Sequence, residues 1–220
     1  MLERADAHIH LFEGGYRSSF AGRPGVQLDE PALYDSLTGE HGVRCALIVG
    51  YAGEAWCADN NAWIARQAQR YAWVRPLAYV DPAQPLTIEQ LEGLAAQGFV
   101  GLSMYVFEPG TVEGLHRISR ETWAWLEARG WLVSANSRGE TWAAWQEVLQ
   151  RHGDLRLLVS HLGLPPRVSA PPTAAEALAA LAAVLALAAA PGPRVKLSGF
   201  YALTEPGHDY PHRAAWPYVQ

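Results

Sequence analysis

The chain has 220 residues, of which 50% are hydrophobic and 18% are charged, and its formal net charge is −5. This length and composition allow one sizeable core and exclude a disordered chain. The negative charge and the absence of a basic run argue against nucleic acid as a partner, because phosphate binding needs a cluster of Lys and Arg. We therefore expect one globular domain that covers residues 1–220.

Two cysteines, Cys45 and Cys57, stand in no metal-binding spacing, and we interpret them as unpaired thiols of a reducing compartment. No apolar leader precedes the first predicted strand, so the expected location is the cytoplasm. The only membrane-like stretch, residues 174–190, is rich in Ala, contains Glu176 and is marginal in length for a span. We predict a buried or half-buried helix there, and no membrane partner.

Residues 5–12, Ala-Asp-Ala-His-Ile-His-Leu-Phe, are predicted to form the first strand. The two-residue period of a strand sends Asp6, His8 and His10 to one face and the apolar side chains to the other. The two imidazoles can converge on one metal ion or one substrate oxygen, since their Cα atoms lie about 6.6 Å apart. The alternative is a chance pair on a surface strand. Asp6 is expected to orient His8, as carboxylates behind metal-binding histidines do.

Strand-like and helical patterns alternate along the rest of the chain. Six further strands are predicted at residues 43–49, 74–80, 99–107, 131–136, 155–162 and 194–203. Helices are predicted between them at residues 31–40, 59–71, 88–97, 119–129 and 141–152, followed by the Ala-rich helix. Asp59 is a predicted N-cap, and Gly98, Gly130 and Gly153 are predicted to end helices. Seven βα units favour an α/β fold, the (β/α)8 TIM barrel, with the eighth strand missing or truncated at the C-terminus.

Polar residues gather where the predicted strands end, which is the face that carries the active site of a TIM barrel. Ser103 and Tyr105, on the fourth strand, either contact substrate or fill the barrel interior. Asn136 and Arg138 follow the fifth strand, and His161 ends the sixth. Arg138 either binds a substrate carboxylate through its planar guanidinium or is a solvated loop residue.

Other candidates lie outside the strand ends. Arg17 and Arg23, in a long predicted loop over residues 14–31, have the same two interpretations as Arg138. Trp56 is a pocket candidate, whereas the tryptophans of the predicted helices are expected to pack those helices onto the barrel. The remaining histidines are expected at the surface; they are His41, His116 and His152.

Four stretches carry a family resemblance: residues 6–12, 78–82, 159–163 and 196–199. Together they resemble the amidohydrolase-related (amidohydrolase 2) family, and more narrowly its TIM-barrel hydrolases similar to pyrone-dicarboxylate lactonase. The resemblance implies a hydrolase of a small cyclic or carboxylated substrate. It also implies that His8 and His10 bind a divalent metal ion, usually zinc, and that His161 assists the chemistry or joins the metal ligands.

Two positions depart from the family pattern. Asn136 stands where the family has a metal-binding histidine, and an amide is a poor zinc ligand. The strand-eight aspartate, which would be the general base, has no clear counterpart, because the only late aspartate, Asp209, lies in a Pro/Gly-rich stretch. A metal-free route therefore stays open, in which His8, His10 and His161 donate hydrogen bonds to the scissile carbonyl oxygen.

Three functions are compatible with these expectations. The first is a lactonase- or amidohydrolase-type hydrolase that opens a small cyclic ester or amide with an activated water. The second is a metal-dependent decarboxylase of the same branch. The third is a truncated, non-catalytic barrel, whose unpaired strand edges would favour a homo-oligomer.

Overall fold

The structure is a computed structural model that describes residues 3–16, 28–207 and 210–220. The candidate residues Arg17, Arg23 and Asp209 lie outside the described residues. The strands are β1 (Arg4–Ile9), β2 (Val43–Val49), β3 (Val74–Tyr79), β4 (Gly101–Val106), β5 (Leu132–Ser137), β6 (Arg156–Val159) and β7 (Arg194–Val195). The helices are α1 (Glu30–His41), α2 (Asn60–Arg70), α3 (Ile88–Ala96), α4 (Pro109–Arg117), α5 (Arg120–Ala128), α6 (Trp142–Arg151) and α7 (Ala174–Leu185).

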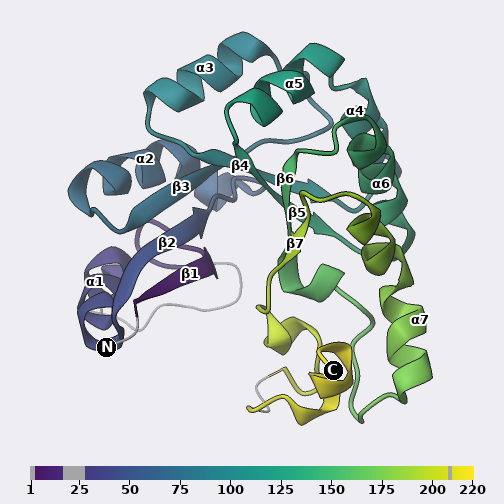
Figure 1. Ribbon diagram of the computed structural model, residues 1–220. Helices are drawn as coiled ribbons and strands as arrows, with labels where there is room; N and C mark the ends of the chain where they lie inside the picture. The colour runs from purple at the N-terminus through teal and green to yellow at the C-terminus, as the bar shows by residue number, and fades with distance from the viewer. Residues whose placement is uncertain (1–2, 17–27, 208–209) are drawn as a thin grey trace. The chain divides into compact units, whose positions relative to one another are not determined.

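The seven strands form one sheet in chain order, β1 to β7, with helices between successive strands (Figure 1). The strand pairs β1–β2, β2–β3, β3–β4, β5–β6 and β6–β7 are parallel. Repeated βα units with sequential parallel strands are the architecture of the TIM barrel. The fold class is therefore that of a TIM barrel, with seven strands in the described part of the chain.

The chain divides into two compact units, and each is described by itself. The first unit comprises residues 1–80 and 89–103, and the second comprises residues 81–88 and 104–220. The expectation of a single domain over residues 1–220 stays a prediction.

The first unit is built on β1, β2 and β3, of which β2 has the bounds expected from its apolar run. Ile48 of β2 pairs with both Ile9 of β1 and Pro76 of β3. Helix α1 begins at Asp29, whose carboxylate accepts the backbone N–H of Ala32. It ends at Gly42, whose φ of 67° suits a residue without Cβ.

The tryptophans of α5 and α6 are buried in the second unit. Trp142 and Trp145 are fully buried, and Trp123 and Trp125 of α5 are also buried. Trp63 of α2 is likewise buried in the first unit. The prediction that helix tryptophans serve packing is confirmed, and apolar aromatic area of this size dominates core stability.

Several expected elements differ in the structure. Helix α4 was not expected, although Pro109 at its first turn and a reciprocal contact of Glu108 with Thr111 start it in the usual way. Strand β7 has two residues rather than ten, because after Val195 the chain bonds to the turn that follows β6, where the backbone N–H of Leu162 donates to the carbonyl of Lys196. The chain then turns at Gly199, which has a φ of 65°. Gly153 does not adopt the left-handed conformation, and Asp59 makes no side-chain capping bond to α2.

Histidine 152 corrects another expectation. It is buried, with 6% of its surface exposed, because its Nδ1 lies 2.8 Å from Glu127 Oε2. His41 and His116 are exposed as expected.

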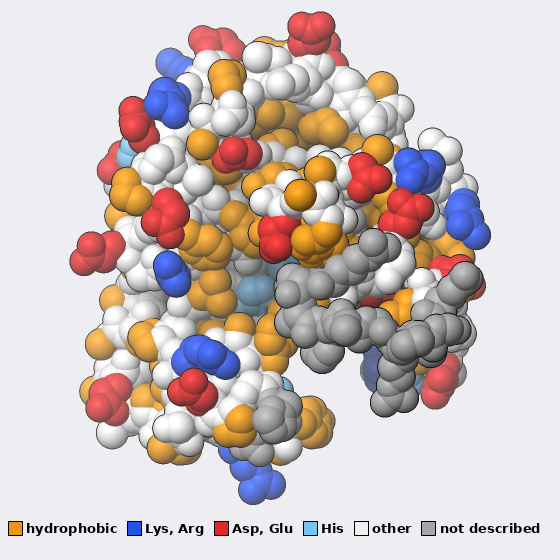
Figure 2. Space-filling view, turned by 180° about the vertical axis from the view of Figure 1, so that it is seen from behind, with side chains coloured by type: hydrophobic (Ala, Val, Ile, Leu, Met, Phe, Trp, Pro, Cys, Tyr) orange, Lys and Arg blue, Asp and Glu red, His pale blue; other side chains and the backbone are white. Residues whose placement is uncertain are grey.

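The surface and the thiols give three further observations. Cys45 and Cys57 are free thiols. On the face shown in Figure 2, acidic and basic side chains are interspersed. Among the described residues, no helix has both the length and the apolar character needed to cross a membrane.

Candidate functional site

The two histidines of the first unit face each other at the end of β1. His8 Nε2 and His10 Nε2 lie 3.1 Å apart, and the two rings are nearly perpendicular. Two imidazole nitrogens bound to one tetrahedral zinc ion at about 2.05 Å would lie about 3.3 Å apart. The spacing therefore matches that of two ligands of one ion.

The backbone of β2 decides which nitrogen of His10 carries a proton. His10 Nδ1 lies 2.7 Å from the carbonyl oxygen of Val49. A carbonyl oxygen only accepts hydrogen bonds, so Nδ1 must donate, and in the neutral ring Nε2 then carries the lone pair. This is the tautomer that a metal ligand needs. Neutral His10 cannot donate to an oxyanion from Nε2, which weighs against the metal-free role.

Asp6 bonds to the backbone of His8. Its Oδ1 accepts the His8 backbone N–H at 2.9 Å, and its Oδ2 accepts the Tyr34 hydroxyl at 2.8 Å. Burial raises the pKa of Tyr34 well above its ordinary value, and the hydrogen bond and charge of Asp6 raise it further. Asp6 thus ties β1 to α1 close to the histidine pair.

Two asparagines at the start of α2 hold the carboxyl ends of the first three strands. Asn60 accepts the backbone N–H of Tyr51 at 3.1 Å and donates to the carbonyl of Leu11 at 2.9 Å. Asn61 accepts the N–H of Tyr79 and donates to its carbonyl, both at 2.8 Å. Backbone N–H and C=O groups lose their strand partners where a strand ends, and these two side chains supply hydrogen-bond partners for such groups.

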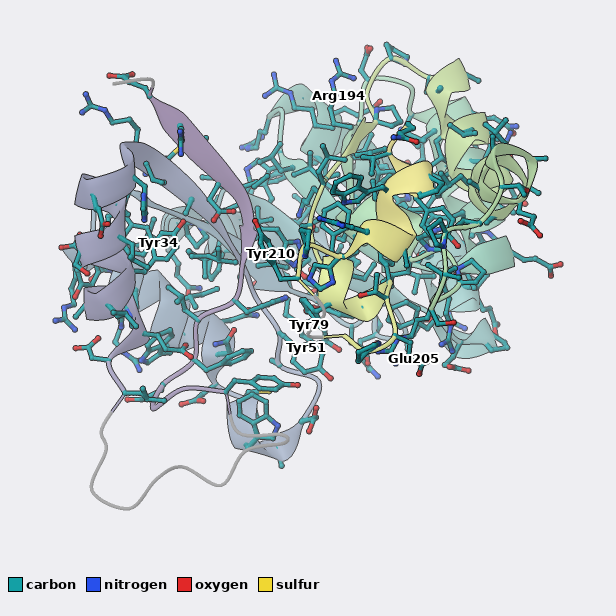
Figure 3. All side chains as sticks on the ribbon, turned by 90° about the horizontal axis from the view of Figure 1, so that it is seen from below. Tyr34, Tyr51, Tyr79, Arg194, Glu205 and Tyr210 are labelled. Atoms are coloured by element: carbon teal, nitrogen blue, oxygen red, sulfur yellow. The ribbon has the colours of Figure 1, made fainter. Side chains whose placement is uncertain are left out.

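Aromatic side chains surround this end of the first unit. Tyr51 and Tyr79 lie side by side with ring centroids 5.6 Å apart (Figure 3). Phe12 contacts both Trp56 and Tyr16 and stacks on His10 at 6.2 Å. Burial, followed by the charge of Glu54, raises the pKa of Tyr51. Trp56, the expected pocket residue, is therefore part of an aromatic cluster next to the histidine pair.

His161 lies at the end of β6 in the second unit, in an unusual backbone turn. Residues 161–164 all have positive φ values, between 51° and 81°. Side chains other than glycine adopt this conformation only where the surrounding structure holds them, and such residues concentrate at functional sites. His161 is buried, and its Nδ1 lies 3.0 Å from Ser198 Oγ.

A buried polar network joins β5, β6 and the segment after β7. Lys196 Nζ donates to Ser134 Oγ at 2.7 Å, and this hydroxyl lies 3.3 Å from Ser160 Oγ. All three residues are buried. In the sequence, Lys196 and Ser198 stand out only as part of the family-like stretch 196–199. The useful signal was a lysine inside an apolar run, because a buried ammonium group needs polar partners from other elements.

Asn136 is on β5, the strand that also carries Ser134 of this network. It is 2% exposed, and its side-chain Nδ2 is buried with no hydrogen-bond partner among the residues that the structure describes. A buried amide donor without a partner is costly, so its presence favours a ligand role. An N–H group suits a substrate oxygen, whereas it does not suit a metal ion.

The other predicted site residues have different surroundings. Arg138 is exposed; its guanidinium lies 5.5 Å from the centre of the Phe107 ring, and one nitrogen is 3.9 Å from Glu108 Oε1. Tyr105 is half-buried with its ring 6.1 Å from that of Phe107, so the three side chains form one group in the second unit, of which Arg138 is the exposed member. Ser103, in the first unit, is fully buried, and its Oγ has no partner in the described ranges.

The described residues test the expected metal site in part. Within either unit, no group of three His, Cys, Asp or Glu side chains is gathered in the described ranges. His8 and His10 have the spacing and, for His10, the tautomer of metal ligands, but a catalytic zinc ion takes three protein ligands. The first unit therefore supplies two donors that fit a metal ion, and the described residues of that unit do not complete the set.

Comparison with solved structures supports the fold. An amidohydrolase from Burkholderia multivorans with bound zinc has a TM-score of 0.68 at 21% identity, and the match covers 93% of this chain and 72% of that one. A putative 2-pyrone-4,6-dicarboxylic acid hydrolase from Pseudomonas putida has a TM-score of 0.66 at 18% identity, covering 99% and 75%. A probable hydrolase of the same acid from Acinetobacter baumannii, with citric acid bound, has a TM-score of 0.62 at 18% identity, covering 92% and 73%.

No curated protein sequence matches the chain. The family model for amidohydrolases matches residues 5–219, which is nearly the whole sequence. The strand with the histidine pair, the strand with His161 and the segment around Lys196 all lie inside this match. The chain belongs to the amidohydrolase family.

Proposed function

We propose that this chain is a hydrolase of the lactonase type, which opens a small, carboxylated cyclic ester or amide. The observation that carries the proposal is the histidine pair. The two Nε2 atoms lie 3.1 Å apart, and the contact with the Val49 carbonyl leaves the lone pair of neutral His10 on the nitrogen that faces His8. This arrangement favours a metal ligand pair over the metal-free role.

The roles divide among a few side chains. His8 and His10 would hold a divalent ion, which supplies Lewis-acid polarisation of a carbonyl when bound. Asn136 would donate from its buried Nδ2 to a substrate oxygen. His161 would accept a proton from the attacking water and return one to the leaving ring oxygen. The bond between the water oxygen and the carbonyl carbon forms, the ring C–O bond breaks, and the second proton of the water is released to solvent, so the products from an ester are an alcohol and a carboxylate.

Recognition of carboxylates is proposed for the group formed by Tyr105, Phe107 and Arg138. The Arg138 guanidinium is exposed and lies 3.9 Å from Glu108, a separation at which an exposed ion pair is weak. A substrate carboxylate can compete with such a pair through a bidentate hydrogen bond. Similar proteins named for a dicarboxylic acid, one of them with bound citric acid, support this substrate class.

The test is a ring-opening assay. The purified chain is mixed with 2-pyrone-4,6-dicarboxylic acid and with uncharged lactones, and opening is followed by loss of the ring absorbance and by proton release. We expect turnover of the dicarboxylate. His161→Ala should be at least about a hundredfold slower, since acid–base groups contribute about 10²–10⁴-fold, and His10→Ala should also be slower, since it removes one ligand of the ion that polarises the carbonyl. His116→Ala, which changes an exposed histidine, is the matched control and should keep wild-type rates.

The same assay separates the competing functions. Release of carbon dioxide without ring opening would replace the hydrolase proposal with the decarboxylase. No ring opening and no release of carbon dioxide with any of these substrates, in folded and zinc-supplied protein, would reject both enzymatic functions. A preference for uncharged lactones would reject the carboxylate-binding role of Arg138 alone.

A further inference from the structure

The left-handed turn at the end of β6 is held by groups of the second unit. The backbone N–H of Leu162 donates to the carbonyl of Lys196 at 3.2 Å, and that of Leu164 donates to the carbonyl of His161 at 2.9 Å. Trp142 Nε1 donates to the carbonyl of Gly163 at 2.9 Å. The unfavourable backbone is therefore fixed by specific bonds from α6 and from the segment after β7, and the position of His161 is fixed with it.

The His161 ring also packs against the segment after β7. Gly199 has a φ of 65°, and a Cβ placed on it would lie 2.1 Å from His161 Nδ1. The imidazole thus packs directly against a backbone that only glycine allows. Ser198, the preceding residue, places its Oγ 3.0 Å from the same Nδ1. One edge of the ring is in this way determined by two adjacent residues.

Two of the histidines with assigned roles, His10 and His161, have different partners at Nδ1. The partner of His10 is the Val49 carbonyl, which accepts only, so His10 is held in one neutral tautomer. The partner of His161 is a serine hydroxyl, which both donates and accepts. The hydroxyl can accept from a protonated Nδ1 or donate to an unprotonated one, so the contact survives in either tautomer and in the imidazolium ion.

We propose that Ser198 is a positioning residue of His161: it holds the ring at Nδ1 while allowing Nε2 either to accept or to donate a proton. This inference rests on the proposed function, because it assigns to His161 the proton transfers of ring opening. It also explains why the proton-transfer histidine has a hydroxyl partner whereas the metal-binding histidine has a carbonyl partner. Ser198, which is outside the reacting groups, then contributes to the geometry of both proton-transfer steps.

The test combines a spectroscopic measurement with kinetics on the full chain. The ¹⁵N shifts of the His161 ring, assigned by comparison with His161→Gln, report the tautomer at one fixed pH. They are recorded for wild type, Ser198→Ala, Ser198→Thr and Ser198→Cys. Ser36→Ala, which removes an exposed hydroxyl bonded to the Leu33 carbonyl in α1, is the control. Turnover of 2-pyrone-4,6-dicarboxylic acid is measured on the same samples.

We expect Ser198→Ala to shift the His161 ring nitrogens and to lower kcat by about tenfold or more with KM within about twofold, as loss of an orienting partner typically costs 10–100-fold. Ser198→Thr keeps the hydroxyl and should restore both readouts. If Ser198→Ala does not fold, Ser198→Cys, a weaker hydrogen-bonding side chain of similar size, should show the same changes in smaller measure.

Each outcome has one meaning. Unchanged ring shifts and unchanged kcat in Ser198→Ala, or a loss that threonine does not restore, would overturn the positioning role. Changed ring shifts, restored by threonine, in a protein that opens no lactone would support the positioning of His161 and reject the proposed function. The spectroscopic result therefore separates the two failures.

Discussion

His8 Nε2 lies 3.1 Å from His10 Nε2, and the opposite edge of the His10 ring is bonded to the carbonyl of Val49. The carbonyl of Val49 in β2 therefore orients the His10 ring of the pair. In the absence of a metal ion, an N–H of His8 can donate to the lone pair of His10, which keeps both rings in the same orientation. If the pair binds an ion as proposed, the two rings are already arranged for it, so little reorganisation would be needed on binding.

The first prediction concerns metal content. Protein purified without chelators should contain zinc, and His8→Ala and His10→Ala should each lose it, because each variant removes one ligand. Elemental analysis of the three proteins checks this, with His116→Ala as a control for loss of any histidine. Zinc retained by both variants would show that the ion is bound elsewhere.

The second prediction concerns alkaline pH. The pKa of Tyr34 is raised in the folded protein, first by burial and then by the hydrogen bond and charge of Asp6. The folded state thus favours the neutral phenol, so this contribution to stability is complete below the unfolded pKa of about 10 and is lost as the pH rises above it. Urea unfolding between pH 8 and pH 11 should show a steeper loss for wild type than for Tyr34→Phe. Equal slopes would contradict the prediction.

The third prediction concerns the buried pair of His152 and Glu127. His152 Nδ1 lies 2.8 Å from Glu127 Oε2, and the ring is close to Trp123. His152→Ala removes the bond and leaves a hole next to Trp123, so we expect a loss of about 1–3 kcal/mol in the free energy of unfolding. Denaturant titration measures it. His41→Ala, at an exposed position, should change stability by less than about 0.5 kcal/mol.

The fourth prediction concerns the end of β3. Asn61 makes two hydrogen bonds to the backbone of Tyr79, one as donor and one as acceptor. Asn61→Ala should destabilise the protein by about 1–3 kcal/mol, since two backbone groups lose their partners. Asn61→Asp keeps only the acceptor and should lie in between. Hydrogen exchange of the Tyr79 amide locates the effect, and unchanged exchange in Asn61→Ala would refute the assignment.

Much of the fold was predictable because local patterns dictate it. The apolar run of β2 has the bounds Val43–Val49 expected from sequence, and α1, α2 and α3 differ from expectation by a residue or so at their ends. The position of His8 and His10 at the end of β1 also follows from local sequence. The short β7 did not, because the residues after Val195 bond to the turn of β6 instead of continuing a strand.

The sequence by itself determined the βα repeat, the placement of polar residues at strand ends and the pairing of two imidazoles, because these depend on periodicity over a few residues. Only the tertiary structure decided the tautomer of His10, the left-handed turn that carries His161, and the contact of that ring with Ser198. The partners involved are 39 residues apart for His10 and Val49 and 37 apart for His161 and Ser198. Hydrogen-bond partners this distant are chosen by the packing of whole elements, which no local pattern contains.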